Sequence, residues 1–161
     1  MHPSGQLKRL EEAHDRFRAC IRLLPEALFT TLMDGWSPRD VVAHLVGWNR
    51  HTVAGCRDIL DGRKPKYLAD HVHDFSNVNA ESIERYSTDD RDELLTELDK
   101  SFAELRVYLE SVDAKQWEAH CGVPYDQWVI YAPHSVDALC DDYDAHREEI
   151  ERWSLAVVPD T

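Results

Sequence analysis

Asp142 and His146 stand four residues apart in a stretch whose apolar side chains recur at alternating steps of three and four. On a helix, positions i and i+4 share one face with Cβ atoms about 5–6 Å apart, which suits a two-residue metal clamp. Burying an acid and a histidine in a small core is costly unless they are hydrogen-bonded, ion-paired or bound to a metal. The pair is therefore a candidate functional site. The periodic residues around it are Val136, Leu139, Tyr143, His146, Ile150 and Trp153.

A second histidine, His44, lies in the apolar stripe of an earlier predicted helix, beside Val41, Leu45 and Trp48. If the two helices are neighbours, two imidazoles and one carboxylate would leave positions on zinc, nickel, iron or manganese open for water or substrate. The competing interpretation is that both histidines are hydrogen-bonded core residues and that Asp142 pairs with one of them or with an arginine. Spacing alone leaves both interpretations open.

Several other residues are weaker candidates for the site. His51 lies one helical face beyond His44 and could support it, whereas His14 occupies a core position of the first predicted helix. His71 and His73 are two apart in a predicted loop and are weaker candidates as ligands. Cys121 is the one cysteine in a predicted loop and hence the one candidate nucleophile among the four cysteines.

Size and charge limit the classes of function. The 161 residues, 43% of them apolar, fit a single domain over 1–161 that needs no metal or disulfide to fold. The four cysteines are widely spaced without a CxxC pair, which favours reduced thiols. A net charge of −13 repels phosphate backbones and anionic lipids, so neither nucleic acid nor a membrane is expected as a partner. We expect a cytoplasmic protein, since no apolar run or basic leader stands out.

Four amphipathic helices must position the candidate residues. The first, second and fourth are predicted over 6–24, 38–61 and 135–153. The third is predicted to follow a capping segment at 87–90. Ser37 is the expected N-cap of the second helix, with Pro38 at its first position and Asp40 three residues after the cap. The pattern predicts an all-α four-helix bundle with a long connection between helices 2 and 3.

The segments between these helices are predicted in less detail. The connection over 63–78 should cross from one end of the bundle to the other, followed by a short helix over 79–86. A helical turn is expected over 114–120 and an aromatic-rich loop over 122–133, of which 125–131 could be extended. Trp128, in that loop just before the last helix, is the tryptophan best placed to contact a ligand.

The segment from Trp36 to Asn49, WSPRDVVAHLVGWN, resembles the helix-2 motif of the DinB-like four-helix bundles, and especially of their ClbS/DfsB branch. The segment from Tyr143 to Trp153, YDAHREEIERW, is similar to the helix-4 ending of the same superfamily, and Asn79 also resembles a position of that branch. The resemblance covers nearly the whole chain. It implies a bundle that is often a homodimer and that carries a metal triad.

Carried over residue by residue, the implied triad is His44, Asp142 and His146, with an acid where the superfamily most often has histidine. A carboxylate also coordinates zinc, nickel or iron. The resemblance implies an enzyme in which a divalent metal activates water or a small-thiol cofactor to attack a small electrophile, as a hydrolase or a thiol transferase. The alternatives are a metal-free ClbS-like self-resistance hydrolase and a non-catalytic bundle that binds a small molecule.

Overall fold

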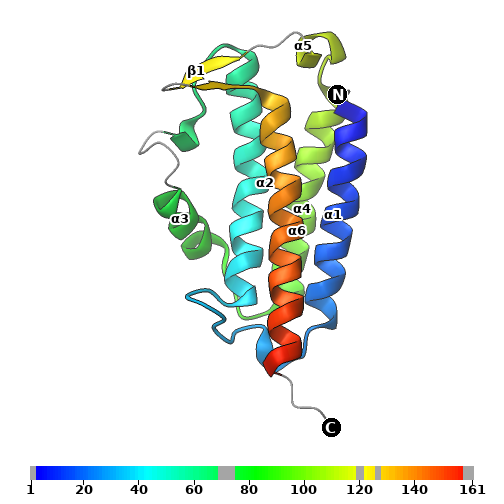
Figure 1. Ribbon diagram of the computed structural model, residues 1–161, viewed down its shortest axis with the longest axis vertical. Helices are drawn as coiled ribbons and strands as arrows, with labels where there is room; N and C mark the ends of the chain where they lie inside the picture. Colours follow the sequence, from blue (N-terminus) through cyan, green and yellow to red (C-terminus); the bar gives the residue numbers. More distant parts are fainter. Residues whose placement is uncertain (1–2, 69–74, 119–121, 126–127, 158–161) are drawn as a thin grey trace.

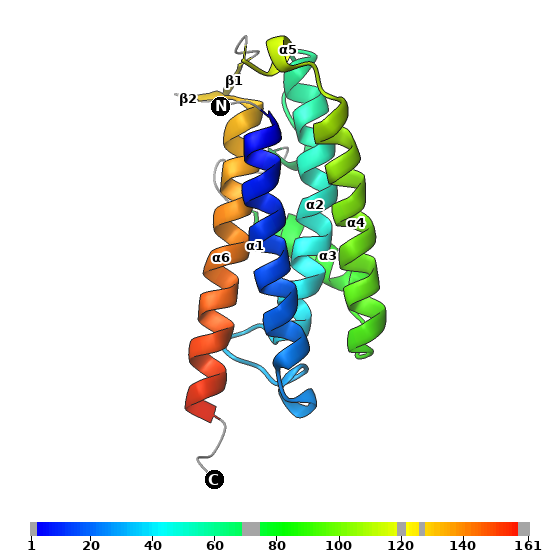
Figure 2. The ribbon, with the colours of Figure 1, turned by 90° about the vertical axis from the view of Figure 1, so that its right-hand side faces the viewer.

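Four long helices lie side by side in the computed structural model, which describes residues 3–68, 75–118, 122–125 and 128–157. They are α1 (Pro3–Leu23), α2 (Pro38–Leu60), α4 (Arg91–Ser111) and α6 (Ala132–Val157) (Figure 1). Helices α1 and α6 run in one direction, and α2 and α4 run in the opposite one (Figure 2). The predicted four-helix bundle is confirmed. Within the described ranges, no helix has the length and apolar character needed to cross a membrane.

The connection between α2 and α4 returns the chain to the end of the bundle where α2 began (Figure 1). It contains a short 3₁₀ turn, η2 (Lys66–Leu68), and the helix α3 (Ser76–Tyr86), which lies on the outside of α2. The crossing agrees with the one that the sequence predicts, and it lets α4 run parallel to α2. Helix α3 begins three residues before its predicted start.

Local chemistry accounts for the starts of α2 and α4. The Ser37 hydroxyl accepts from the Asp40 backbone N–H at 3.2 Å, and the Asp40 carboxylate accepts from the Ser37 N–H at 3.0 Å, which completes a capping box. Asp90 caps α4 by accepting from the Glu93 N–H at 3.0 Å. Both caps fall where the sequence predicts them. Before α2, a 3₁₀ turn, η1 (Glu26–Leu28), follows α1.

The predicted loop over 122–133 is wrong in part. A hairpin stands there, formed by β1 (Val123–Tyr125) and β2 (Trp128–Ile130), with Val123 paired with Ile130 in antiparallel register. The two strands contain β-branched and aromatic residues that favour extended backbone, but three residues are too few to show a periodicity of two. Helix α6 starts three residues earlier than predicted, and α5 (Ala114–Glu118) confirms the expected helical turn.

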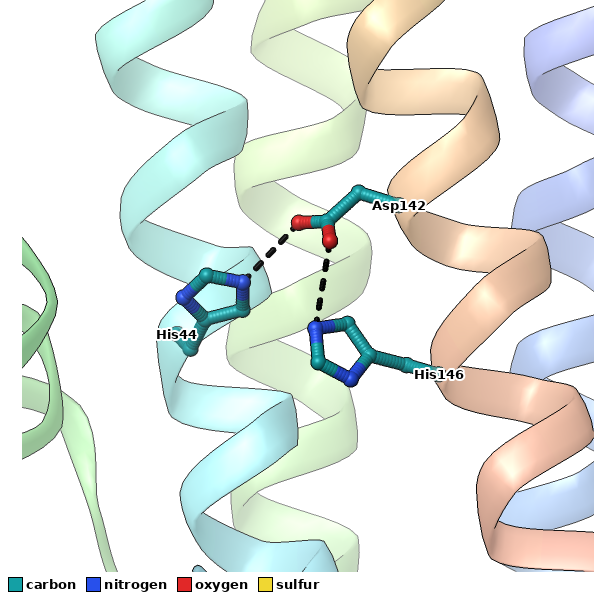
Figure 3. A group of neighbouring side chains, drawn as sticks. All are labelled: His44, Asp142 and His146. Carbon is teal, nitrogen blue, oxygen red and sulfur yellow. Dashed lines mark hydrogen bonds and ion pairs between the residues drawn. The ribbon is translucent and has the colours of Figure 1, made fainter. Parts of the chain in front are cut away.

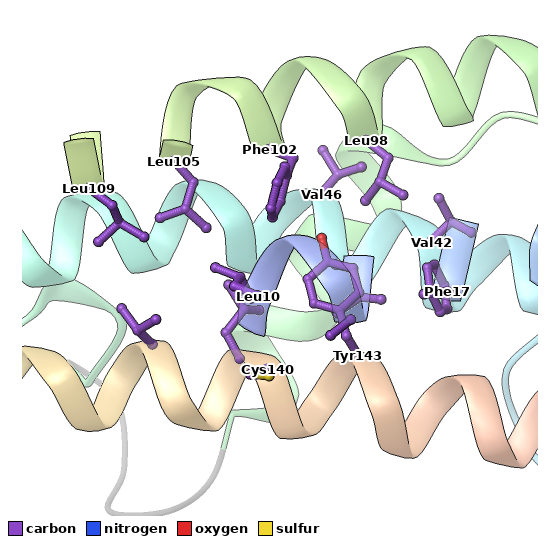
Figure 4. Packing of buried hydrophobic residues seen from close by; sticks show 14 of the residues in the cluster. Leu10, Phe17, Val42, Val46, Leu98, Phe102, Leu105, Leu109, Cys140 and Tyr143 are labelled. Atoms are coloured by element: carbon purple, nitrogen blue, oxygen red, sulfur yellow. The ribbon is translucent and has the colours of Figure 1, made fainter. Parts of the chain in front are cut away.

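Apolar side chains from all four long helices meet in one core (Figure 4). A buried hydrogen-bonded chain crosses it: the Tyr143 hydroxyl donates to Asn49 Oδ1 at 2.7 Å, and Asn49 Nδ2 donates to Ser101 Oγ at 3.0 Å. Because these residues come from α6, α2 and α4, the chain holds the three helices in one axial register. That register matters for function, since Tyr143 directly follows Asp142.

Two glycines of α2 allow the connection to pack closely against that helix. A Cβ at Gly47 would overlap the Ser82 side chain of α3, and a Cβ at Gly55 would overlap the ring of Tyr67. Both glycines therefore bring polar and aromatic groups of the connection onto the surface of α2. One side of the candidate site is built in this way.

Candidate metal centre and adjoining cavity

The three candidate ligands come together on the outer side of α2 and α6 (Figure 3). His44 Nε2 lies 2.9 Å from Asp142 Oδ2, and His146 Nε2 lies 3.2 Å from Asp142 Oδ1. One ligand atom from each residue lies within 4.8 Å of the other two. The histidine side chains are 6% and 16% exposed, and that of Asp142 is 35% exposed. The site is thus largely enclosed but open on one side.

Asn79 of α3 determines which nitrogen of His44 carries a proton. The Trp48 indole N–H donates to Asn79 Oδ1 at 2.7 Å, so the amide oxygen faces α2. His44 Nδ1 lies 3.1 Å from the same oxygen, and an oxygen acceptor requires a proton on that nitrogen. In a neutral ring, the lone pair of His44 is then on Nε2 and points at the Asp142 carboxylate. Because a lone pair cannot face a carboxylate at 2.9 Å unassisted, either a second proton on the ring, which then donates to Asp142, or a metal ion must lie between the two atoms.

Asp142 is the negative centre of this arrangement. Burial alone would raise the pKa of its carboxyl group, but the hydrogen bonds with His146 and His44 outweigh burial and hold that pKa well below its usual range. The group is therefore ionised at neutral pH. Its two oxygens face two different histidines. The carboxylate therefore links His44 of α2 to α6 and also contacts His146, one turn further along α6 (Figure 3).

Trp36, in the segment before α2, packs beside both histidines. Its ring centroid lies 5.0 Å from that of His44 and 6.3 Å from that of His146. The two imidazoles are 5.1 Å apart and nearly perpendicular. The buried Nδ1 atom of His146 has no hydrogen-bond partner among the described residues, so the ring is oriented by its Nε2 contact with Asp142 and by packing.

The donor set fits a divalent transition metal. Two imidazole Nε2 atoms and a carboxylate are ligands for zinc, nickel, iron or manganese, and three protein ligands leave room for an exchangeable one. The hydrogen bond from His44 to Asn79 is the outer contact that metal-ligating histidines usually make. These residues could therefore hold the metal with Asp142 in place of a third histidine.

A cavity of about 720 Å³ opens beside the triad. Helix α2, the connection with α3, the strand β2 and helix α6 all contribute to its walls, and His44 and Asp142 lie at its edge. Most of its lining is apolar or aromatic; the polar exceptions include the Tyr67 and Ser135 hydroxyls, 3.3 Å apart. A molecule in this cavity would lie directly against the candidate metal ligands.

The other predicted candidates have different outcomes. His14 is a core residue, stacked on Phe102 with ring centroids 4.1 Å apart, and it lies outside the cavity lining. His51 packs edge-on against Trp48 and does not touch the triad. Trp128 lines the cavity, as its position before α6 indicated. His71, His73 and Cys121 lie outside the described residues.

Sequence reasoning missed the aromatic residues of the connection. Tyr67 and Phe75 line the cavity and pack against Trp48 with ring centroids 5.2 Å and 5.3 Å away. Neither belongs to a periodic stripe. The signal that could have identified them is the presence of large rings in an otherwise polar segment, next to a helix with Gly47 and Gly55 on its surface.

The described cysteines are not nucleophiles for this site. Cys20, Cys56 and Cys140 are free thiols, and none lines the cavity. Burial raises the pKa of the Cys56 thiol to about 12 and that of Cys20 to about 11, so both stay protonated at neutral pH. None of these three thiols is placed to react at the site, and Cys121 lies outside the described residues.

Fold and site together define a DinB-like helical bundle. The chain belongs to the family described as the mycothiol maleylpyruvate isomerase N-terminal domain, whose pattern matches residues 10–151. In sequence, no curated protein matches the chain.

Three solved structures share this fold. The mycothiol-dependent maleylpyruvate isomerase superposes with a TM-score of 0.73 at 18% identity, over 93% of this chain and 61% of that one. The colibactin self-resistance protein ClbS, in complex with double-stranded DNA, gives 0.77 at 11% identity, over 98% of each chain. The sibling lethal factor precursor DfsB gives 0.72 at 11% identity, over 97% of this chain and 96% of that one. At such identities the likeness shows the fold alone. The present chain spans about 61% of the isomerase.

Proposed function

We propose that this protein is an enzyme in which His44, Asp142 and His146 hold a divalent metal, and that a small thiol cofactor attacks an electrophile bound in the adjoining cavity. The observation that carries the proposal is the convergence of two Nε2 atoms on one ionised carboxylate, at the edge of an apolar cavity. A metal bound there would lower the pKa of a bound thiol or water and so make a nucleophile available at neutral pH.

The residues of the chain have separate roles in this proposal. Asn79 keeps the Nδ1 proton on His44 and so directs Nε2 to the centre. Trp36 shields the two imidazoles on one side. The cavity holds the electrophile and excludes water from its apolar parts, which favours attack by a bound thiol over hydrolysis.

The family supports a thiol over water as the nucleophile. The family is named after mycothiol maleylpyruvate isomerase, and one solved structure with this fold is the mycothiol-dependent maleylpyruvate isomerase. The reaction would form a sulfur–carbon bond while a leaving group departs with its electron pair and the thiol proton passes to solvent. A metal-free self-resistance hydrolase and a non-catalytic binding bundle remain as alternatives, and one solved structure with this fold is the self-resistance protein ClbS.

The partners follow from the same argument. A small electrophile is the proposed substrate, and a homodimer stays a prediction. ClbS is seen with DNA, but a net charge of −13 makes a phosphate backbone an unfavourable partner for the present chain, and we still expect no nucleic acid.

Metal analysis of protein purified without an affinity tag tests the first step. We expect close to one equivalent of zinc, nickel, iron or manganese, lost in Asp142→Asn and kept in Asp144→Asn. The control removes the same charge from the same helix at a residue that pairs with Arg16 instead. Absence of metal in the wild type, with no uptake when zinc or nickel is added, would contradict the proposal.

Thiol transfer can be followed with monobromobimane, an uncharged conjugated electrophile that becomes fluorescent when a thiol displaces its bromide. We expect the wild type to accelerate its reaction with cysteine or mycothiol, and His146→Gln and chelator treatment to remove the acceleration. Activity that survives the chelator but not the substitution would favour the metal-free hydrolase. Ligand recovered unchanged after long incubation would favour the binding bundle.

A further inference from the structure

The cavity beside the triad is walled by flat aromatic side chains. Trp48, Tyr67 and Phe75 form one group whose centroids lie 5.2 to 6.2 Å apart. Trp128 of β2 adds a second indole, which is 61% exposed. Aromatic faces bind flat conjugated molecules by stacking, and they attract cations through the negative charge of the ring face. The walls therefore suit a planar ligand.

The charges around the cavity are one-sided. Asp141 and Asp142 line it, and none of the described lining residues is lysine or arginine. The segments outside the described ranges contain no lysine or arginine in their sequence, so they cannot supply one. Among the described lining residues, the imidazoles are those of His134 and His44, and the latter already faces Asp142. Unless a metal is bound at the triad, a carboxylate or phosphate here would meet two acids without a permanent positive charge to balance it.

We infer that the part of the electrophile that lies in this cavity, away from the proposed metal, is flat, conjugated and uncharged or positively charged, without a carboxylate or phosphate group. A cavity of about 720 Å³ is large enough for a molecule of several fused or linked rings. Only the statement that the ligand is an electrophile rests on the proposed function. The charge preference of the cavity can be measured without any reaction.

The test uses three probes that share one ring system and differ in charge: naphthylmethylammonium, naphthylmethanol and naphthoate. Equilibrium dialysis near neutral pH measures binding of each probe to chelator-treated protein and to protein given zinc. In the metal-free protein we expect the ammonium and the alcohol to bind at least about tenfold more tightly than naphthoate, the effect of one unfavourable charge contact near the surface. Naphthoate binding that equals or exceeds ammonium binding would overturn the inference.

Two variants localise the effect to the cavity. Trp128→Ala should weaken binding of all three probes by about threefold or more, because it removes one stacking surface. Asp141→Asn should reduce the gap in binding affinity between the ammonium and the naphthoate probe, and it should leave the affinity for the alcohol unchanged. Glu149→Gln removes the same charge from α6 at a residue outside the cavity lining and should leave the gap as it is. Equal effects of the two charge changes, or unchanged binding in Trp128→Ala, would overturn the inference.

The outcomes separate this inference from the proposed function. If the triad takes up no metal while the probes keep the expected order, the proposed enzyme fails and the ligand preference of the cavity stands. If metal uptake and thiol transfer occur while naphthoate binds best to the metal-free protein, the enzyme stands and the inference fails.

Discussion

His44 Nε2 and Asp142 Oδ2 lie 2.9 Å apart, although the residues are 98 positions apart in the chain. The contact joins α2 to α6, and the buried hydrogen bond between Tyr143 and Asn49 holds those helices in the register that it needs. Because His44 donates its Nδ1 proton to Asn79, the lone pair of a neutral ring is on Nε2 and faces the carboxylate. A metal ion or an additional proton must lie there, which is why the site is suited to a cation.

The first prediction concerns the outer contact of His44. Asn79→Leu removes the acceptor for Nδ1, so the proton can move to Nε2 and block the ligand atom. Outer hydrogen bonds of this kind are typically worth about 10- to 100-fold in metal affinity. We expect a loss of that size in zinc affinity, measured by competition with a chelating dye. Asn77→Leu, at an exposed position of the same helix, should leave the affinity unchanged.

The second prediction compares two tyrosines. Tyr143→Phe deprives Asn49 Oδ1 of its donor in the core and should lower the free energy of unfolding by about 1–3 kcal/mol. The Tyr108 hydroxyl is buried without a hydrogen-bond partner among the described residues, so Tyr108→Phe should be neutral or stabilising. Urea unfolding of both variants measures the difference. A larger loss in Tyr108→Phe would contradict the assigned role of the Tyr143 network.

Individual residues show how far the sequence could predict this protein. The capping box at Ser37 and the pairing of Asp142 with His146 involve residues three or four positions apart, and helix geometry alone determines them. The meeting of His44 with Asp142 depends on how two distant helices pack, and only the resemblance to DinB-like bundles indicated it. Tyr67 and Phe75 escaped notice because their positions depend on contacts with Trp48 and not on a local pattern.

The third prediction concerns the close approach of α3 to α2. Gly47→Ala places a Cβ where the Ser82 side chain lies, and overpacking of this kind typically costs about 1–3 kcal/mol. Alanine also favours the helix over glycine by about 1 kcal/mol, so the net loss should be smaller than the strain. Displacement of α3 would also move Asn79, and zinc affinity should fall with stability. The double variant Gly47→Ala with Ser82→Gly removes the overlapping atoms and should recover much of both losses in chemical unfolding and dye competition. Additive losses would show that the two residues do not touch.

The last prediction is a pH dependence of stability that comes from His14. Burial lowers the pKa of this histidine in the folded protein below its ordinary value of 6.5. The unfolded chain therefore takes up a proton more readily than the folded one, and protonation favours unfolding. The contribution of His14 to stability is complete above about pH 6.5 and is lost as the pH falls below that value towards the folded pKa. His14→Phe keeps the stacking on Phe102 but cannot take up a proton, so its stability should fall less steeply between neutral and mildly acidic pH. Urea unfolding at several pH values measures both slopes, and equal slopes in the two proteins would show that the ring already exchanges its proton freely in the folded state.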